Sequence, residues 1–199
     1  MSSVIRAFIA IELPKEISAR LEGVIQELQN RLGQSVVRWV AINNIHLTLK
    51  FLGNVSDTNL DVLQKLLTNE SRNRQPFEMS VGDLGAFPSV RRARVIWTGV
   101  QAPPDLIQLQ RAIEAETARL GYAAEERGFT PHLTLGRVSR NANANDARRI
   151  SQALDELQVG FLGAMRVEAV HLFRSDLKPG GAVYTRLFTA PLGLPAKKI

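Results

Sequence analysis

The chain has 199 residues, of which 45% are hydrophobic and 22% are charged, so it can bury a sizeable core and is too apolar for general disorder. A formal charge of +6 favours an anionic partner, with nucleic acid as the first candidate. The lack of cysteine excludes disulfides, thiolate nucleophiles and cysteine-ligated zinc, and it fits a reducing cytoplasm. Because no run approaches the roughly 18 apolar residues of a membrane span, we expect a cytoplasmic protein without a membrane partner.

The first half of the chain alternates between strand and helix patterns. Period-two alternation predicts a strand at residues 4–12, and apolar residues at helical spacing predict a helix that opens at Pro14 and stops at Gly33. Further elements are expected as strands at 38–40 and 45–52 and as a helix at 58–67.

The second half repeats this order. It predicts strands at 77–87 and 94–100, a helix at 104–120, a strand at 130–138, a helix at 146–157, and strands at 161–174 and 184–189. Arg6 precedes His46 by nearly the same interval as Arg94 precedes His132, which indicates an internal duplication.

The duplication predicts an α+β fold. We expect a single domain over residues 1–199, made of two pseudo-symmetric lobes at approximately 1–90 and 91–190, with a tail at 191–199. Each lobe is expected to be an antiparallel sheet with helices packed outside, and the two lobes are expected to face each other across a central cleft.

The most informative feature is a tetrapeptide that occurs once in each half. His46-Leu47-Thr48-Leu49 and His132-Leu133-Thr134-Leu135 both lie in predicted strands. Side chains two residues apart in a strand point the same way and lie roughly 6.5 to 7 Å apart. Each motif is therefore expected to present an imidazole and a hydroxyl on one face and to bury its leucines on the other.

Two imidazoles near one phosphate are suited to acid–base catalysis. Their unperturbed pKa of about 6.5 lets one take a proton from an attacking water while the other protonates the leaving oxygen. The threonine hydroxyls can hydrogen-bond the non-bridging phosphate oxygens, where charge builds up. This chemistry needs no metal and no cofactor.

A structural interpretation competes with the functional one. One such motif alone is most often an ordinary strand, but a duplication that preserved only the fold would need the leucines and not the histidine and threonine. His171 has no matching motif and is interpreted as structural or incidental. Lys50 shares the face of His46, where an exposed lysine near a strand end is favoured over a phosphate contact.

The surrounding sequence carries a family resemblance. Its motifs are Arg6-Ala7-Phe8, Arg38-Trp39-Val40, the run from His46 to Gly53, Gly85-Ala86-Phe87-Pro88, Arg94-Val95-Ile96-Trp97 and the run from Phe129 to Arg137. With these motifs, nearly the whole chain resembles the two-histidine (2H) phosphoesterase superfamily, specifically the bacterial and archaeal RNA 2′,3′-cyclic phosphodiesterases, which are also described as RNA 2′-5′ ligases.

The resemblance implies an activity and roles for four residues. It implies hydrolysis of a terminal 2′,3′-cyclic phosphate to a 2′-phosphomonoester, with the 3′ oxygen leaving, and 2′-5′ ligation as a reverse reaction. By position, His46 would be the proton donor and His132 the proton acceptor, although the near-symmetry of the halves leaves this order open. Thr48 and Thr134 would hold the phosphate.

Two further residues are candidates for substrate binding. Phe8 lies on the polar side of its strand, where either a base or another side chain would stack on it, or where it would cover the interface between lobes. The resemblance implies that Arg137 is a phosphate ligand. Strict alternation places Arg137 opposite His132, so this role needs the strand to end or twist at Gly136.

Two other functions compete with the enzyme. The first is a non-catalytic RNA-binding module that uses its basic surface. The second is a metal hydrolase, which is disfavoured because neither motif has a carboxylate beside its histidine and the chain has only three histidines. For the enzyme we expect RNA or nucleotides with 2′,3′-cyclic phosphate ends as partners, and a monomer.

Overall fold

The computed structural model describes residues 3–179 and 181–193. Its strands are β1 (Val4–Glu12), β2 (Val37–Trp39), β3 (His46–Ser56), β4 (Phe77–Phe87), β5 (Val95–Gln101), β6 (His132–Val138), β7 (Phe161–Val167), β8 (Ala169–Lys178) and β9 (Gly181–Pro191). Its α-helices are α1 (Lys15–Leu32), α2 (Leu60–Arg72), α3 (Pro104–Arg119) and α4 (Ala144–Glu156). Short 3₁₀ turns lie at Ile42–Asn44, Asp57–Asn59 and Val90–Arg92. The expected tail at 191–199 falls outside the described residues from 194 onward.

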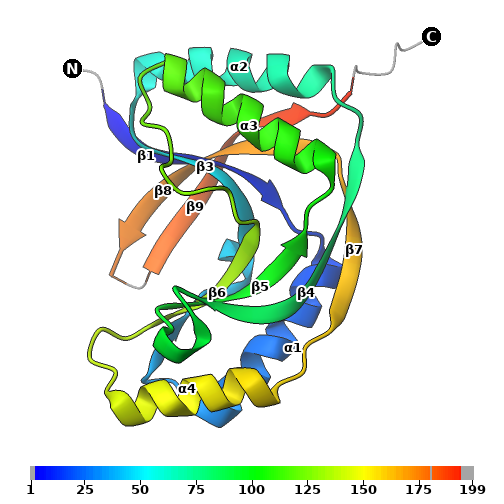
Figure 1. Ribbon diagram of the computed structural model, residues 1–199. Helices are drawn as coiled ribbons and strands as arrows, with labels where there is room; N and C mark the ends of the chain where they lie inside the picture. The colour runs from blue at the N-terminus through cyan, green and yellow to red at the C-terminus, as the bar shows by residue number, and fades with distance from the viewer. Residues whose placement is uncertain (1–2, 180, 194–199) are drawn as a thin grey trace.

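The strands form two antiparallel sheets, with the orders β3-β1-β8-β9 and β2-β6-β5-β4-β7. Helices α2 and α3 lie together beside the four-stranded sheet, and α1 and α4 lie together at the other end of the molecule (Figure 1). The predicted α+β class with antiparallel sheets and helices is confirmed. None of the helices in the described part of the chain has the length and apolar character needed to cross a membrane.

The two expected lobes would place the strands before residue 90 in one sheet and the strands after it in the other. The observed sheets do not divide in this way. Strands β2 and β4 from the first half belong to the five-stranded sheet, whereas β8 and β9 from the end of the chain return to the four-stranded sheet. The helices are exchanged as well: α1 packs on β7 of the five-stranded sheet, and α3 packs on β3 of the four-stranded sheet. Each lobe is therefore assembled from both halves of the chain.

Specific contacts hold the exchanged helices. The guanidinium of Arg20 on α1 donates to the carbonyl of Leu162 on β7, and Gly163 leaves room for the Ile17 side chain, which a Cβ at this position would meet. On α3, the amide of Gln110 donates to the carbonyl of Leu49 at 3.4 Å. Alternation along single strands does not encode these contacts between elements.

The strand predicted at 161–174 is two strands. β7 ends at Val167 and β8 begins at Ala169, and the two belong to different sheets. The chain thus passes from one sheet to the other at Glu168. A break of one residue leaves the hydrophobic pattern almost unchanged, so the sequence does not reveal it.

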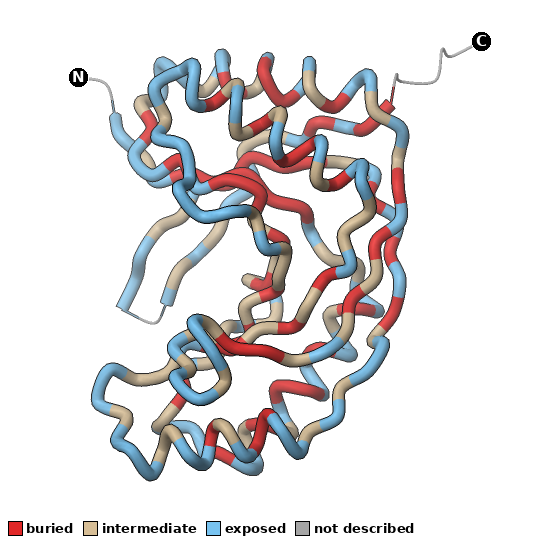
Figure 2. Tube along the Cα trace, viewed as in Figure 1, coloured by how far each residue is buried: buried red, intermediate tan, exposed pale blue. Residues whose placement is uncertain are grey.

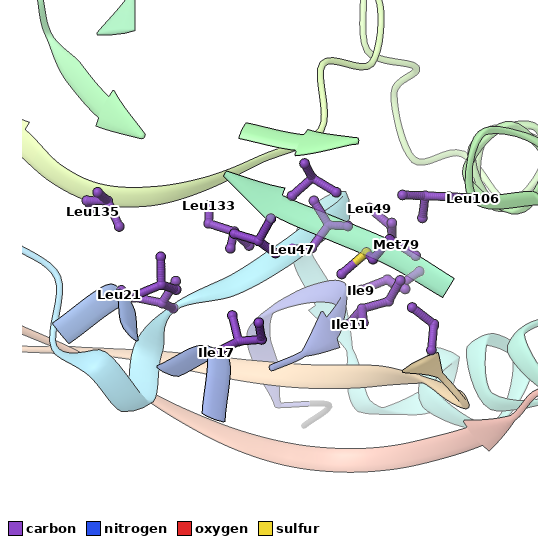
Figure 3. Packing of buried hydrophobic residues seen from close by; sticks show 14 of the residues in the cluster. Ile9, Ile11, Ile17, Leu21, Leu47, Leu49, Met79, Leu106, Leu133 and Leu135 are labelled. Atoms are coloured by element: carbon purple, nitrogen blue, oxygen red, sulfur yellow. The ribbon is translucent and has the colours of Figure 1, made fainter. Parts of the chain in front are cut away.

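One apolar cluster joins both sheets and all four helices. Figure 3 shows part of this cluster, including residues of β1, α1, β3 and β6. The cluster includes Leu47 and Leu49 of β3 together with Leu133 and Leu135 of β6, all of which are buried. Buried residues follow the strands and the inward sides of the helices (Figure 2). The core therefore fixes the backbone of both strands that carry the repeated tetrapeptide.

Candidate active site

The two histidine strands lie against each other in the fold. His46 opens β3 and His132 opens β6, and these two strands are in contact. The predicted division of faces is confirmed, because the leucines of both motifs are buried while the histidines and threonines remain partly exposed. The core side of each motif anchors the strand, and the opposite side is left for chemistry.

Each histidine strand contains a β-bulge at the same place in its motif. Along β3, Thr48 pairs with Ala10 and Lys50 pairs with Ile9, so Leu49 has no cross-strand partner. Along β6, Thr134 pairs with Trp97 and Gly136 pairs with Ile96, which leaves Leu135 without one. An extra residue reverses the alternation of everything that follows it.

The bulge in β6 places Arg137 on the face of His132. Arg137 pairs with Val95, which in turn pairs with Phe87, and the Phe87 ring meets the His132 ring edge-on with centroids 4.9 Å apart. Residues in one cross-strand row share a face of the sheet. The orientation that a phosphate ligand needs is thus present, but it arises at Leu135 and not from a strand end at Gly136.

The bulge in β3 has the opposite effect on Lys50, which turns into the protein. Lys50 is 1% exposed, and its Nζ donates to Glu114 Oε1 and to the Ala123 carbonyl, both at 2.5 Å. The prediction of an exposed lysine on the His46 face is wrong, because the alternation changes at Leu49. A phosphate contact by this buried ammonium is ruled out by the same placement.

A backbone group two residues earlier holds each imidazole. Nδ1 of His132 lies 2.7 Å from the carbonyl oxygen of Thr130, and a backbone hydrogen bond with Asn44 acts on His46. Since a carbonyl oxygen only accepts, Nδ1 of His132 carries the hydrogen of this bond. The Nε2 atom of His132 is then available to give or take a proton.

The environment of His46 is aromatic. Its ring stacks on Phe8 with centroids 4.6 Å apart and meets Tyr184 edge-on at 5.2 Å, and Phe173 stacks on Phe8 at 5.2 Å. Burial lowers the pKa of His46 to about 4, although the backbone hydrogen bond with Asn44 raises it. The imidazole is therefore neutral at pH 7 in the unliganded protein.

The neighbours of Phe8 are protein side chains, whereas a nucleobase was one of its predicted partners. It is 3% exposed, with His46 and Phe173 stacked on it and Tyr184 at its edge. The ring is covered by side chains, so it orients His46 and offers no face to a nucleobase. Of the interpretations that the sequence allowed, stacking with another side chain is the one found.

His132 is surrounded by Phe87 and Trp97. The Trp97 ring lies 6.4 Å from the imidazole between centroids and contacts Phe87 at 5.2 Å. Gly85 allows this arrangement, because a Cβ there would overlap the Trp97 ring. The second histidine is thus positioned by aromatic packing, as the first one is.

His171 lies on the same face of the four-stranded sheet as Thr48, because both are cross-strand partners of Ala10. It is 7% exposed, and its Nδ1 hydrogen-bonds with the Thr189 hydroxyl at 3.0 Å. The pKa of His171 is lowered, mainly because the ring is buried. The carboxylate of Glu12 partly opposes this change, and the charge of Arg186 adds to it. The interpretation of His171 as structural or incidental stays a prediction, because its ring also contacts Phe173 at 5.9 Å between centroids.

Phe51 is a residue of this face that sequence reasoning missed. It follows His46 at the same distance as Arg137 follows His132, and it is 59% exposed with its ring 6.2 Å from that of Phe8. Aligning the two motifs beyond their fourth residues would have identified it. Within the part of the chain that the structure describes, no group of three or more His, Cys, Asp or Glu could hold a metal ion.

Comparison with known proteins places this arrangement in a family. The model of the 2′-5′ RNA ligase superfamily matches residues 10–179, which include both histidine motifs. The chain belongs to the 2′-5′ RNA ligase superfamily. A member from Methanothermobacter thermautotrophicus named RNA 2′,3′-cyclic phosphodiesterase is 35% identical over 181 residues, which are 91% of this chain and 95% of that protein.

Solved structures share the fold. The protein TT0787 of Thermus thermophilus superposes with a TM-score of 0.80 at 26% identity, and Escherichia coli LigT complexed with 3′-AMP superposes with a TM-score of 0.76 at 29% identity. In both cases the match covers 96% of this chain and 99% of the other chain.

Proposed function

We propose that this superfamily member hydrolyses the 2′,3′-cyclic phosphate at the end of an RNA to a 2′-phosphomonoester, with His46 and His132 as its acid–base pair and without a metal. The observation that carries the proposal is the repeated His-x-Thr at matching places on two contacting strands, each with a bulge after the threonine. Relatives named RNA 2′,3′-cyclic phosphodiesterase support the choice of substrate.

The reaction follows from the protonation states that two imidazoles can hold at once. Neutral His132 takes a proton from water at Nε2, and the water oxygen bonds to phosphorus. The bond from phosphorus to the 3′ oxygen breaks, and the imidazolium of His46 protonates that oxygen to a hydroxyl. Thr48, Thr134 and Arg137 hydrogen-bond the non-bridging oxygens as their charge grows.

A 5′-hydroxyl in the place of water would give a 2′-5′ linkage by the same proton transfers. Ligation therefore belongs to the proposal as an alternative outcome of one site. We further propose that the protein acts as a monomer, since both motifs lie in one chain, and that it acts in the cytoplasm, whose reducing conditions fit a chain without cysteine.

The donor role of His46 makes a prediction about its pKa. Because burial holds the pKa near 4, a neutral His46 must gain a proton when the phosphate binds, and the negative charge of the ligand favours that gain. We expect sulfate, which does not titrate near neutrality, to raise the pKa of His46 above 4. Nuclear magnetic resonance titration of the ring protons with and without sulfate measures this, and His46→Gln assigns the signal.

A pKa of His46 that stays near 4 while sulfate binds would contradict the donor assignment. His46 would then be the base and His132 the acid. The overall reaction would be unchanged, because only the direction of proton flow differs.

Product analysis tests the function. We expect an RNA oligonucleotide with a 2′,3′-cyclic phosphate end to be converted to a product with a 2′-phosphate and a free 3′-hydroxyl, and phosphorus resonance spectra distinguish this product from a 3′-phosphate. We expect turnover to persist in excess chelator.

Two outcomes of this assay would favour the other candidate functions. Tight binding without any turnover would favour the RNA-binding module. Turnover abolished by the chelator and restored by one divalent ion would favour a metal hydrolase.

A further inference from the structure

An arginine lies directly beside Arg137 on the neighbouring strand. Arg38 of β2 is the cross-strand partner of Arg137 of β6, and both residues are exposed. The Cβ atoms of such partners lie about 4.5 to 5.5 Å apart, and like charges placed directly opposite each other are destabilising. The pair is thus unfavourable unless an anion lies against it.

Nothing in the described residues neutralises these two side chains. Across residues 3–179 and 181–193, no carboxylate oxygen lies within 4.0 Å of either guanidinium. Some exposed arginines have such neighbours, for example Arg31 with Glu27 at 2.8 Å. Others among the described residues, such as Arg111, have none, so the feature that sets Arg38 and Arg137 apart is that they are cross-strand partners.

The sheet orients Arg38 toward the face of His132. Arg38 extends the row of Phe87, Val95 and Arg137, and this row contacts the imidazole through Phe87. The neighbours Val37 and Trp39 lie on the other face, where a Cβ on Gly136 would meet both of them. Arg38 therefore lies on the strand next to the one that carries both Arg137 and His132.

The positive charge continues beyond this row. The connection from β4 to β5 leaves the sheet at Phe87 and returns at Val95, and it carries Arg91, Arg92 and Arg94, which are all exposed. A simpler interpretation is that these arginines keep the end of a sheet soluble. That interpretation does not explain why Arg38 and Arg137 face each other beside the proposed phosphate site.

We propose that Arg38 binds the internucleotide phosphate on the 5′ side of the nucleoside that carries the cyclic phosphate. The cyclic phosphate and this phosphodiester are neighbours on one strand, separated by a single nucleoside, as Arg137 and Arg38 are neighbours in one row. The inference rests on the proposed function and adds a specificity-determining residue, which makes the enzyme prefer the end of an RNA strand over a cyclic mononucleotide.

The experiment compares three substrates that end in a 2′,3′-cyclic phosphate. They are a mononucleotide, a dinucleotide with an ordinary phosphodiester, and the same dinucleotide with a neutral methylphosphonate in its place. The protein variants are wild type, Arg38→Gln, and Arg111→Gln as a matched control, because Arg111 is an exposed arginine on α3 away from this sheet.

We expect wild type and Arg111→Gln to prefer the ordinary dinucleotide over the methylphosphonate by about tenfold in kcat/KM, as for one charge-assisted hydrogen bond. In Arg38→Gln the preference should fall to about one. The slope of log kcat/KM against log salt for the ordinary dinucleotide should become shallower by about 0.7, the value for one phosphate contact on a single strand.

Each outcome has a defined meaning. An unchanged preference in folded Arg38→Gln, or a wild type that does not distinguish the two dinucleotides, would overturn the Arg38 site while leaving the hydrolase intact. A wild type that binds these substrates and hydrolyses none would overturn the proposed function itself. The two dinucleotides test the wild type directly, so the conclusion does not depend on the variant folding.

Discussion

Replacing either His46 or His132 with alanine should lower kcat by about 10² to 10⁴, the contribution typical of one positioned proton-transfer group. Both rings lie on the side of their strands opposite the buried leucines, so the variants should stay folded. Single-turnover kinetics on an RNA with a 2′,3′-cyclic phosphate end, together with a melting curve, measures both effects. Arg111→Gln serves as the control and should keep its turnover, because Arg111 is exposed on α3.

The double variant sharpens this test. If both rings act on one phosphate, the loss in His46→Ala/His132→Ala should be far smaller than the product of the two single losses, because groups that act as a unit are not additive. Losses that multiply would place the two rings in independent sites. Full turnover in either single variant would reject that histidine as a catalytic residue.

Replacing Lys50 with methionine should destabilise the protein by about 3 kcal/mol. The variant leaves Glu114 without its cation and the Ala123 carbonyl without its donor, and removing one member of a buried pair is strongly destabilising. The value lies at the lower end of the usual range because the Glu114 side chain is 19% exposed. Urea unfolding measures the change, with exposed Lys65→Met as the control.

The contacts of Glu114 connect this ion pair to catalysis. Its carboxylate also accepts from the Glu125 backbone at 2.9 Å, in the segment that leads to Thr130 and His132. We therefore expect Lys50→Met to lower kcat as well, and Lys50→Met/Glu114→Gln to recover part of the stability. A stability of Lys50→Met equal to that of Lys65→Met would show that the pair contributes nothing.

The sequence was sufficient for the features that depend on local pattern. The two histidine strands, the burial of Leu47 and Leu133, and the repeated order of strands and helices all follow from alternation, helical spacing and an internal repeat. The four residues of the proposed acid–base site were identified for the same reason, because a motif that occurs twice is visible without any structure.

The features that the sequence could not predict depend on register and on contacts between distant elements. The bulges at Leu49 and Leu135 depend on pairing with the neighbouring strand, which offers no partner to either leucine. They reverse the expected faces of Lys50 and Arg137. Phe8 was ambiguous because its neighbours Phe173 and Tyr184 come from the far end of the chain. For the same reason, the sequence did not predict that each sheet contains strands from both sides of residue 90.

The exchange of helices between the two sheets makes the halves of this repeat mutually dependent. A fragment cut near residue 90 would take α1 away from β7, and its complement would take α3 away from β3, so each piece would expose the apolar surface that the other covers. Loss of order in one sheet must then spread to the other. We therefore expect the two halves of the sequence repeat to unfold as a single cooperative unit, in which a change in the position of one imidazole also affects the other.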